Sequence, residues 1–219
     1  MHGPLMGRRV YLTGFEPFLK IRENPTEAIV QRLDGERFGD VTVASRVLPV
    51  AWEKTPSLLL EDLDRIQPAL CVHLGVSGQA QVIRLERFAY NTIRSAFPDN
   101  VGAQPEEQPI EIGRPVEATL ETPLPLAELL ERLKVDGVPA EISTDPGRYL
   151  CNRAYYASLN RNQAPAIFIH IPHTDNRDPS GERWTLQRLR IGTESILRSL
   201  CEAHCDDPSR AAGLSEGAR

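Results

Sequence analysis

One cysteine and one histidine occupy positions where α/β proteins often place reactive groups. Cys151 lies in the stretch RYLCNRAYY, in the first turn of an expected helix, and His170 ends the apolar stretch AIFIH. A thiol in the first turn of a helix lies near the positive end of the helix dipole and near unpaired backbone N–H groups, which favour its nucleophilic thiolate form. A nearby imidazole can complete the activation of the thiol and later protonate a leaving amine.

A carboxylate that could orient this histidine follows another apolar stretch. Residues 69–74 predict a buried strand, and the segment after it carries Glu86. A carboxylate bonded to the second imidazole nitrogen fixes the tautomer of the ring and stabilises the imidazolium. Cys151, His170 and Glu86 therefore form a candidate hydrolase triad. Residue types alone leave a second interpretation open, in which Cys151 is a buried packing residue and His170 a hydrogen-bonded core histidine.

The elements that must position these residues alternate along the chain. Apolar periodicity and capping signals predict strands at 10–13, 41–48, 69–74, 140–144 and 166–171, and helices at 24–33, 57–67, 124–134, 150–160 and 185–204. Residues 75–122 are rich in Gly, Pro and polar residues, so they predict only a short hairpin or a loop excursion.

Strands that alternate with helices are typical of a mostly parallel, twisted sheet covered by helices on both faces. Ligands of such sheets bind beyond the carboxyl ends of the strands. The strand 140–144, the helix that follows it and the strand 166–171 form one unit, so we expect the two strands to be parallel. Their carboxyl ends would then share one edge of the sheet and bring Cys151 and His170 together.

Length and charge set bounds on the class of protein. The chain has 219 residues and a formal net charge of −5. We expect one domain at 9–205, between a flexible extension at 1–8 and a disordered tail at 206–219. An acidic chain with no run of five like charges does not suit a nucleic-acid or anionic-membrane partner. No apolar run approaches the ~20 residues of a membrane span and no signal peptide is evident, so we expect a cytoplasmic protein with reduced thiols.

Eight short motifs in this chain resemble those of the pyrrolidone-carboxylate peptidases, also called pyroglutamyl peptidase I. In family order they are TGFEPF (13–18), NPT (24–26), RVLPV (46–50), HLGVSG (73–78), ERFAYN (86–91), PDN (98–100), YLCN (149–152) and HIP (170–172). The resemblance implies a three-layer α/β/α sandwich that assembles into a homodimer or homotetramer. It also implies a cysteine peptidase, without metal or organic cofactor, that removes an N-terminal pyroglutamate from peptides through a thioester.

The resemblance assigns roles to five residues. Cys151 would be the nucleophile, His170 the general base and acid, and Glu86 the orienting carboxylate. Phe15 and Phe18 match the aromatic residues that contact the pyroglutamate ring. Stacking the flat, uncharged lactam between aromatic rings would exclude a charged amino terminus through its desolvation cost. The alternative for both phenylalanines is that they close the core beneath the loop.

The chain departs from the family pattern near the expected site. Leu19-Lys20 stands where bacterial members usually have a Gly-Gly pair, Ala96 stands where an arginine is common, and Pro146 replaces a small residue. Arg94 and Arg148 are candidates to supply the missing charge, although exposed arginines are more often simply solvated. These departures bear on substrate preference and rate more than on the type of reaction.

Other cysteine and histidine residues have simpler interpretations. Cys201, His204 and Cys205 have the i, i+3, i+4 spacing of a shared metal site, but core packing with a solvated histidine explains them more simply. Cys71 and His73 alternate in a central strand and are expected to be packing residues, with His73 near the site only as support.

Alternatives remain open for the identity of the base and for the function of the protein. His173, three residues after His170, competes for the role of base, although the HIP motif favours His170. The same triad could serve a related hydrolase of a different cyclic amide or blocked N-terminus. A non-catalytic α/β module that binds a small ligand is the alternative from a different class of protein.

Overall fold

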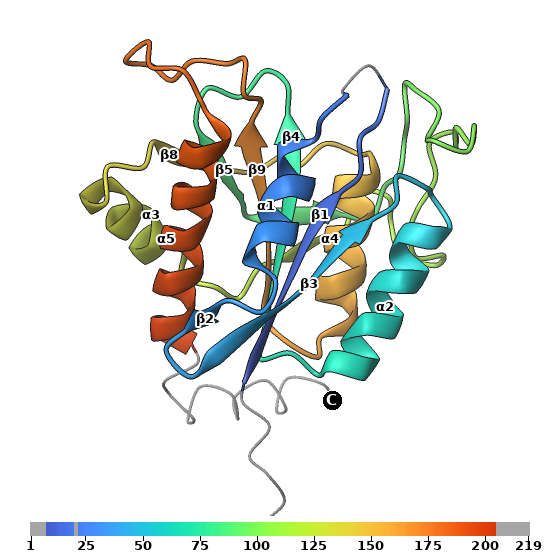
Figure 1. Ribbon diagram of the computed structural model, residues 1–219. Helices are drawn as coiled ribbons and strands as arrows, with labels where there is room; N and C mark the ends of the chain where they lie inside the picture. The colour runs from blue at the N-terminus through green and yellow to red at the C-terminus, as the bar shows by residue number, and fades with distance from the viewer. Residues whose placement is uncertain (1–7, 20–21, 205–219) are drawn as a thin grey trace, which may run out of the picture.

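The computed structural model describes residues 8–19 and 22–204, and its centre is one seven-stranded sheet. The strand order is β2-β3-β1-β4-β9-β5-β8, and helices cover both faces of the sheet (Figure 1). Four of its six strand pairings are parallel, namely β1 with β3, β1 with β4, β4 with β9 and β5 with β8. The expected α/β class with a mostly parallel central sheet is therefore confirmed. The segments 1–8 and 206–219 lie outside the described residues, except for Arg8.

The elements alternate along the chain much as periodicity predicts. Each expected strand and helix is present, with ends that differ by up to three residues. They are β1 (Arg9–Phe15), α1 (Pro25–Leu33), β2 (Arg37–Phe38), β3 (Val41–Leu48), α2 (Lys54–Ile66), β4 (Leu70–Ser77), β5 (Ile83–Glu86), β6 (Phe88–Tyr90), β7 (Thr119–Glu121), α3 (Leu126–Val135), β8 (Ala140–Ser143), α4 (Leu150–Arg161), β9 (Ala166–Pro172) and α5 (Leu186–His204). The strands β6 and β7 form a small antiparallel sheet at the two ends of the loop excursion.

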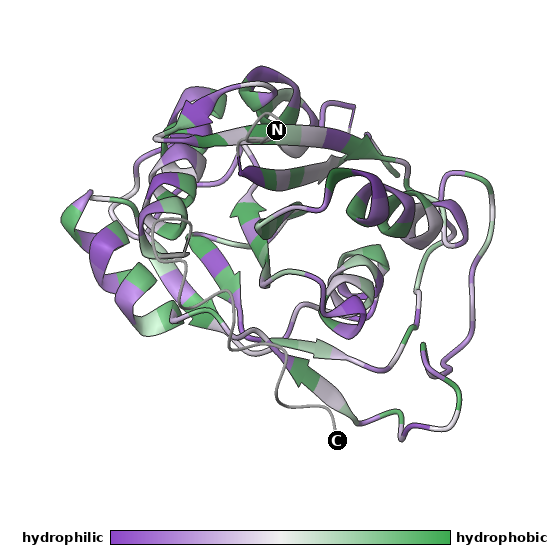
Figure 2. Cartoon of the chain, turned by 90° about the horizontal axis from the view of Figure 1, so that it is seen from below, coloured by the Kyte–Doolittle hydropathy of each residue, from purple (hydrophilic) through white to green (hydrophobic). Residues whose placement is uncertain are grey.

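Two hydrophobic cores lie on opposite faces of the sheet. The helices α1, α3 and α5 pack on one face, and α2 and α4 pack on the other. Every residue of β9 is buried, as expected for a central strand covered on both sides. The helices carry hydrophobic and hydrophilic residues on the same turns, as amphipathic covering helices do (Figure 2). The result is a three-layer α/β/α sandwich.

The strand β5 overturns one prediction about topology. It lies between β9 and β8, antiparallel to β9 and parallel to β8. The strands β8 and β9 are therefore neither neighbours nor parallel, and the predicted shared edge for their carboxyl ends is wrong. The physical reason is the short return after β4: only residues 78–82 separate β4 from β5, and a connection this short cannot make the crossover that a parallel strand needs.

His73, in the middle of β4, is fully buried and hydrogen-bonded through both ring nitrogens. Its Nδ1 lies 2.8 Å from Thr13 Oγ1, and its Nε2 lies 2.8 Å from Ser158 Oγ. Burial lowers the pKa of His73 to about 3. The ring is therefore neutral at neutral pH, and it ties β1 and β4 to α4 as a packing and hydrogen-bonding residue.

We expect His73 to make the fold sensitive to acid. As the pH falls below the ordinary histidine pKa of about 6.5, the unfolded chain takes up a proton at residue 73 and the folded protein does not, because the pKa in the fold is lowered. The contribution of His73 to stability is therefore fully present above pH 6.5 and is lost as the pH falls towards 3. A His73→Gln variant should lose this part of the pH dependence, about 2 kcal/mol between pH 6.5 and 5. Urea unfolding of both proteins at several pH values measures it, with His173→Gln as the control. An unchanged pH dependence in His73→Gln would contradict the assignment.

Candidate active site

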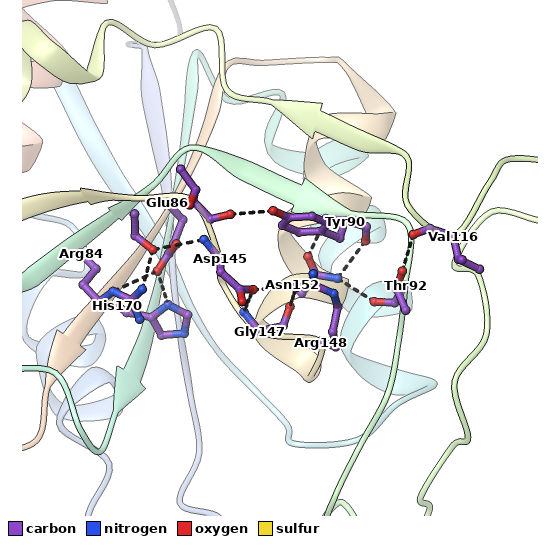
Figure 3. Close-up of polar contacts among 12 residues, drawn as sticks. Arg84, Glu86, Tyr90, Thr92, Val116, Asp145, Gly147, Arg148, Asn152 and His170 are labelled. Atoms are coloured by element: carbon purple, nitrogen blue, oxygen red, sulfur yellow. Dashed lines mark hydrogen bonds and ion pairs between the residues drawn. The ribbon is translucent and has the colours of Figure 1, made fainter.

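Glu86 and His170 meet across the antiparallel pairing of β5 with β9. The register pairs Glu86 with Phe168 and Arg84 with His170, so Glu86 and His170 are diagonal neighbours on the same face of the sheet. His170 Nδ1 lies 2.8 Å from Glu86 Oε1 (Figure 3). The histidine is 7% exposed and the glutamate 0%. This contact gives the imidazole a buried carboxylate partner.

The connection that places Cys151 near Glu86 and His170 differs from the predicted one. The strand β8 ends at Ser143, which is paired with Glu86, and residues 144–149 then lead to the first turn of α4. Cys151 is the second residue of that helix, and its thiol interacts with the His170 ring and raises the pKa of that ring. The structure therefore brings together all three residues of the predicted triad.

The charge state of His170 depends on its two partners. Burial alone lowers the pKa of His170, but the interactions of its ring with Cys151 and with the Glu86 carboxylate, which accepts a hydrogen bond from Nδ1, outweigh burial and raise the pKa to about 9. The ring is therefore protonated at neutral pH. A protonated imidazole beside a cysteine stabilises the thiolate, so the arrangement is suited to nucleophilic attack by sulfur.

Gly75 leaves the space that the Cys151 sulfur occupies. It is paired with His170 in the register of β4 and β9. A Cβ atom at Gly75 would lie 3.0 Å from Cys151 Sγ and 2.8 Å from the Phe168 ring. Any side chain at position 75 would therefore push against the sulfur and the aromatic ring. The sequence contains one signal for this role, a glycine at the end of a buried strand, but we did not assign the role from it.

Asn152, next to the nucleophile, anchors the first turn of α4 to the segment after β6. Its Oδ1 accepts a hydrogen bond from Tyr90 N at 2.8 Å, and its Nδ2 donates to Tyr90 O and Thr92 O, both at 2.9 Å (Figure 3). The side chain is fully buried. These three hydrogen bonds fix the start of the helix, a role that sequence reasoning did not assign to Asn152.

The two predicted ring-contacting residues lie in the same hydrophobic cluster as Cys151. Phe15 ends β1 and is 3% exposed. Phe18 is partly buried, and its ring centroid lies 6.2 Å from that of Tyr149, whose ring also contacts Trp52 at 5.1 Å. Tyr149 therefore adds a further aromatic ring to this cluster, two residues before Cys151. The sequence indicated Tyr149 only as part of the YLCN motif.

A cavity of about 580 Å³ opens beside the loop that leads to the nucleophile. Ala96, Phe97 and Tyr149 contribute to its lining, together with the two arginines considered as replacement charges. Arg148 stacks over the Tyr90 ring at 3.7 Å and pairs with Asp145, whereas Arg94 pairs with Glu107. Both arginines are therefore engaged by neighbouring carboxylates.

The other departures from the family pattern lie in two loops. Leu19 is 54% exposed and has φ 54°, a left-handed conformation that favours glycine, and Lys20 lies outside the described residues. Pro146 is buried within the loop before α4 and is followed by Gly147, which has φ 78°. The turn into the nucleophile helix therefore depends on glycine at position 147.

The remaining histidine and cysteine candidates lie apart from the triad. His173 contacts Asp175 beyond the end of β9, at 3.4 Å. Cys71 is buried, and burial raises its pKa to about 12, so it remains a thiol. Cys201 is a core residue, while Cys205 and the side chain of His204 lie outside the described residues.

Among residues 8–19 and 22–204, no cluster of three or more His, Cys, Asp or Glu side chains is arranged to hold a metal ion. Within the same ranges, no helix has the length and apolar character needed to cross a membrane.

Comparison with known proteins identifies the family. Residues 8–178 match the family model described as pyroglutamyl peptidase. The chain belongs to the pyroglutamyl peptidase family. The prediction made from the sequence motifs is confirmed, and the members of this family are cysteine exopeptidases.

Individual relatives agree with this assignment. The pyrrolidone-carboxylate peptidase of Pyrococcus furiosus is 39% identical over 170 residues, which cover 75% of this chain and 81% of the relative. The enzyme of the same name from Yersinia pestis is 36% identical over 198 residues, covering 87% of this chain and 91% of the relative. A crystal structure of a mutant pyrrolidone carboxyl peptidase from P. furiosus superposes with a TM-score of 0.81 at 31% identity, covering 89% of this chain and 98% of that one.

We expect a Gly75→Ala variant to fold but to lose reactivity at Cys151. The added methyl group must displace Sγ or the Phe168 ring, and a displacement of about 1 Å at a reacting atom can cost on the order of 10²-fold in rate. The rate of alkylation of Cys151 by iodoacetamide measures the effect, with circular dichroism to show that the fold is retained. The matched control is Gly78→Ala, because a Cβ at Gly78 meets no atom within 4 Å. Wild-type alkylation in a folded Gly75→Ala protein would refute this role of Gly75.

Proposed function

We propose that this chain hydrolyses the bond after an N-terminal pyroglutamate in peptides, with Cys151, His170 and Glu86 as its catalytic triad. The observation that carries the proposal is the chain of contacts from buried Glu86 through buried His170 to the partly buried Cys151. Family membership supplies the substrate class, and the geometry supplies the assignment of roles.

In the proposed first step, the Cys151 thiolate attacks the carbonyl carbon of the pyroglutamyl residue. A C–S bond forms, and the carbonyl oxygen becomes an oxyanion. The backbone N–H of Cys151 lies in the first turn of α4, where N–H groups have no acceptor within the helix, so it is a candidate donor to this oxyanion. The His170 imidazolium then protonates the peptide nitrogen as the C–N bond breaks, leaving a thioester and a free amino terminus.

In the second step, neutral His170 removes a proton from a water molecule as that water attacks the thioester carbon. The C–S bond breaks, free pyroglutamate leaves, and the thiolate and imidazolium are restored. Glu86 remains a carboxylate throughout and holds Nδ1 of the ring. No group beyond water and the substrate is needed to balance these steps.

We place the lactam ring against Phe15 and Phe18, with Tyr149 as a further wall. These side chains share a hydrophobic cluster with Cys151, and an apolar pocket favours an uncharged lactam over a charged amino terminus. The cavity beside residues 145–149 has room for the rest of the peptide, and Ala96 leaves part of its lining small.

We also propose a cytoplasmic location and a homodimeric or homotetrameric assembly. The location rests on the acidic composition and the thiol chemistry of the site, and the assembly rests on the family resemblance. Light scattering after size-exclusion chromatography distinguishes a dimer, a tetramer and a monomer.

We expect the protein to hydrolyse a chromogenic pyroglutamyl amide and to leave the prolyl and glutamyl amides intact. Cys151→Ser should abolish turnover and still bind 5-oxoproline, because it removes the nucleophile and leaves the pocket unchanged. In the wild type, 5-oxoproline should block alkylation of Cys151. The matched control is Cys71→Ser, whose thiol is buried away from the triad. A Cys151→Ser protein with more than a trace of activity would reassign the nucleophile, and binding without turnover by the wild type would favour a non-catalytic module.

We expect kcat/KM to decrease as the pH rises through about 9, where His170 loses the proton that it must donate. Glu86→Gln should move this alkaline limb to lower pH, because it removes the negative charge that raises the pKa of His170. Its rate should decrease by roughly 10²-fold or less, whereas His170→Ala should lose on the order of 10³-fold. Steady-state kinetics from pH 6 to 10 measure both effects. A limb that stays in place in Glu86→Gln would exclude Glu86 as the partner of the ring.

A further inference from the structure

Arg84 is the residue of β5 that lies directly opposite His170 in the register. It is two residues before Glu86, so both side chains project from the same face of the sheet. Its Nε lies 4.0 Å from Glu86 Oε1 and 3.4 Å from Glu141 Oε1. Its Nη2 donates a hydrogen bond to Ser143 Oγ at 2.7 Å (Figure 3). The guanidinium thus lies between the buried carboxylate of the triad and the edge strand β8.

The carboxylate of Glu86 has only the His170 ring as a side-chain hydrogen-bond partner among the described residues. It is fully buried, and its second oxygen, Oε2, has no hydrogen-bond partner among the described residues. A buried carboxylate with a single hydrogen bond is costly unless a nearby charge compensates it. Among residues 8–19 and 22–204, Arg84 is the only arginine or lysine in ion-pair contact with Glu86. The Arg84 side chain is only 30% exposed, so water screens its charge incompletely.

We propose that Arg84 is a positioning residue of the triad, which stabilises the charged carboxylate of Glu86 and so controls how tightly His170 holds its proton. The proposal rests on the function proposed above for Glu86 and His170. A cation this close stabilises the carboxylate and opposes a positive charge on the neighbouring ring. Arg84 therefore limits the proton affinity of His170, so that the ring releases its proton to the leaving amine.

A second contact connects Arg84 to the nucleophile. Ser143 Oγ, which accepts the hydrogen bond from Arg84, also accepts one from Asp145 N at 3.3 Å. Asp145 begins the turn that leads to Cys151. The guanidinium therefore connects the strand that carries the triad carboxylate to the loop that carries the nucleophile. Substitution by lysine separates the effect of the Arg84 charge from the effect of its hydrogen bonds, because lysine keeps the positive charge and lacks the planar guanidinium group.

The other titratable groups around Glu86 and His170 leave this role to Arg84. Tyr155 donates its hydroxyl to Glu86 O, and burial raises its pKa, so it stays neutral. His73 is neutral as well. The remaining charged groups on the packed elements are Cys151 on α4, Glu141 on β8 and Asp145, which pairs with Arg148. Of these, Glu141 is in ion-pair contact with Arg84, and the Arg84 charge also lowers the pKa of Asp145. Glu141 is therefore the strongest competitor of Glu86 for the Arg84 charge.

The test compares two substitutions that should act in opposite directions. Arg84→Met removes the cation, so the alkaline limb of kcat/KM should move up by about 0.5 to 1 on the pH scale, with a decrease in kcat/KM near pH 7. Glu141→Gln removes a carboxylate that competes with Glu86 for the Arg84 charge. The alkaline limb of kcat/KM should therefore move to lower pH, by a smaller amount. Arg84→Lys should return the limb close to its wild-type position. A purely structural role would not produce shifts of opposite sign.

Ring NMR provides a readout that needs no turnover. The titration of His170 in histidine-labelled protein, assigned through His170→Gln, should show the same upward and downward shifts. Ring titrations that do not move in Arg84→Met and Glu141→Gln would overturn the proposal. If Arg84→Met fails to fold, a downward shift in Glu141→Gln still supports it, and an unchanged one still overturns it. The His170 titration could shift in opposite directions in Arg84→Met and Glu141→Gln while the wild type fails to hydrolyse pyroglutamyl amides. That outcome would support the role of Arg84 and contradict the proposed function.

Discussion

The contact between Glu86 and His170 is the interaction on which the site depends, and it exists because β5 runs antiparallel to β9. If β5 ran in the opposite direction, the carboxylate would lie at the other end of the sheet from the imidazole. The short return at 78–82 enforces this direction. It also places the carboxylate inside the sandwich, where it is fully buried and its charge acts at low dielectric. The reversal of one strand therefore sets both the geometry and the electrostatics of the site.

The sheet face beneath α4 shows how partners decide the charge of a buried histidine. His73 and His170 lie on neighbouring strands of this face, and both are buried. Both ring nitrogens of His73 are hydrogen-bonded to neutral hydroxyl groups, so burial dominates and its pKa falls to about 3. His170 meets a carboxylate and a thiol, and its pKa rises to about 9. One imidazole is suited to holding elements together, while the other is suited to carrying a proton.

Periodicity predicted the helices and the central strands well, because long amphipathic helices and buried apolar strands have strong patterns. It did not find β5, whose four residues IRLE alternate over too short a length, and it could not give the direction of that strand. The convergence of Cys151 and His170 was predicted correctly from a wrong strand pairing. Resemblance in the motifs suggested the residues of the proposed triad. Gly75 and Arg84 became visible only through the register, because each lies opposite a residue of another strand.

The position of the nucleophile depends on the sheet more than on the variable loops. Gly75 sets how closely Cys151 approaches β4, Asn152 ties the helix start to the segment after β6, and Ser143 links the preceding turn to β5. Gly75, Asn152 and Ser143 are buried and lie outside the loops that carry Leu19 and Ala96, and only Asn152 contacts one of these loops, at Thr92 near its start. Differences from the family pattern in those loops can therefore alter how a peptide binds without moving the reacting atoms. Such changes should alter KM more than kcat, because they act on binding rather than on the transition state alone.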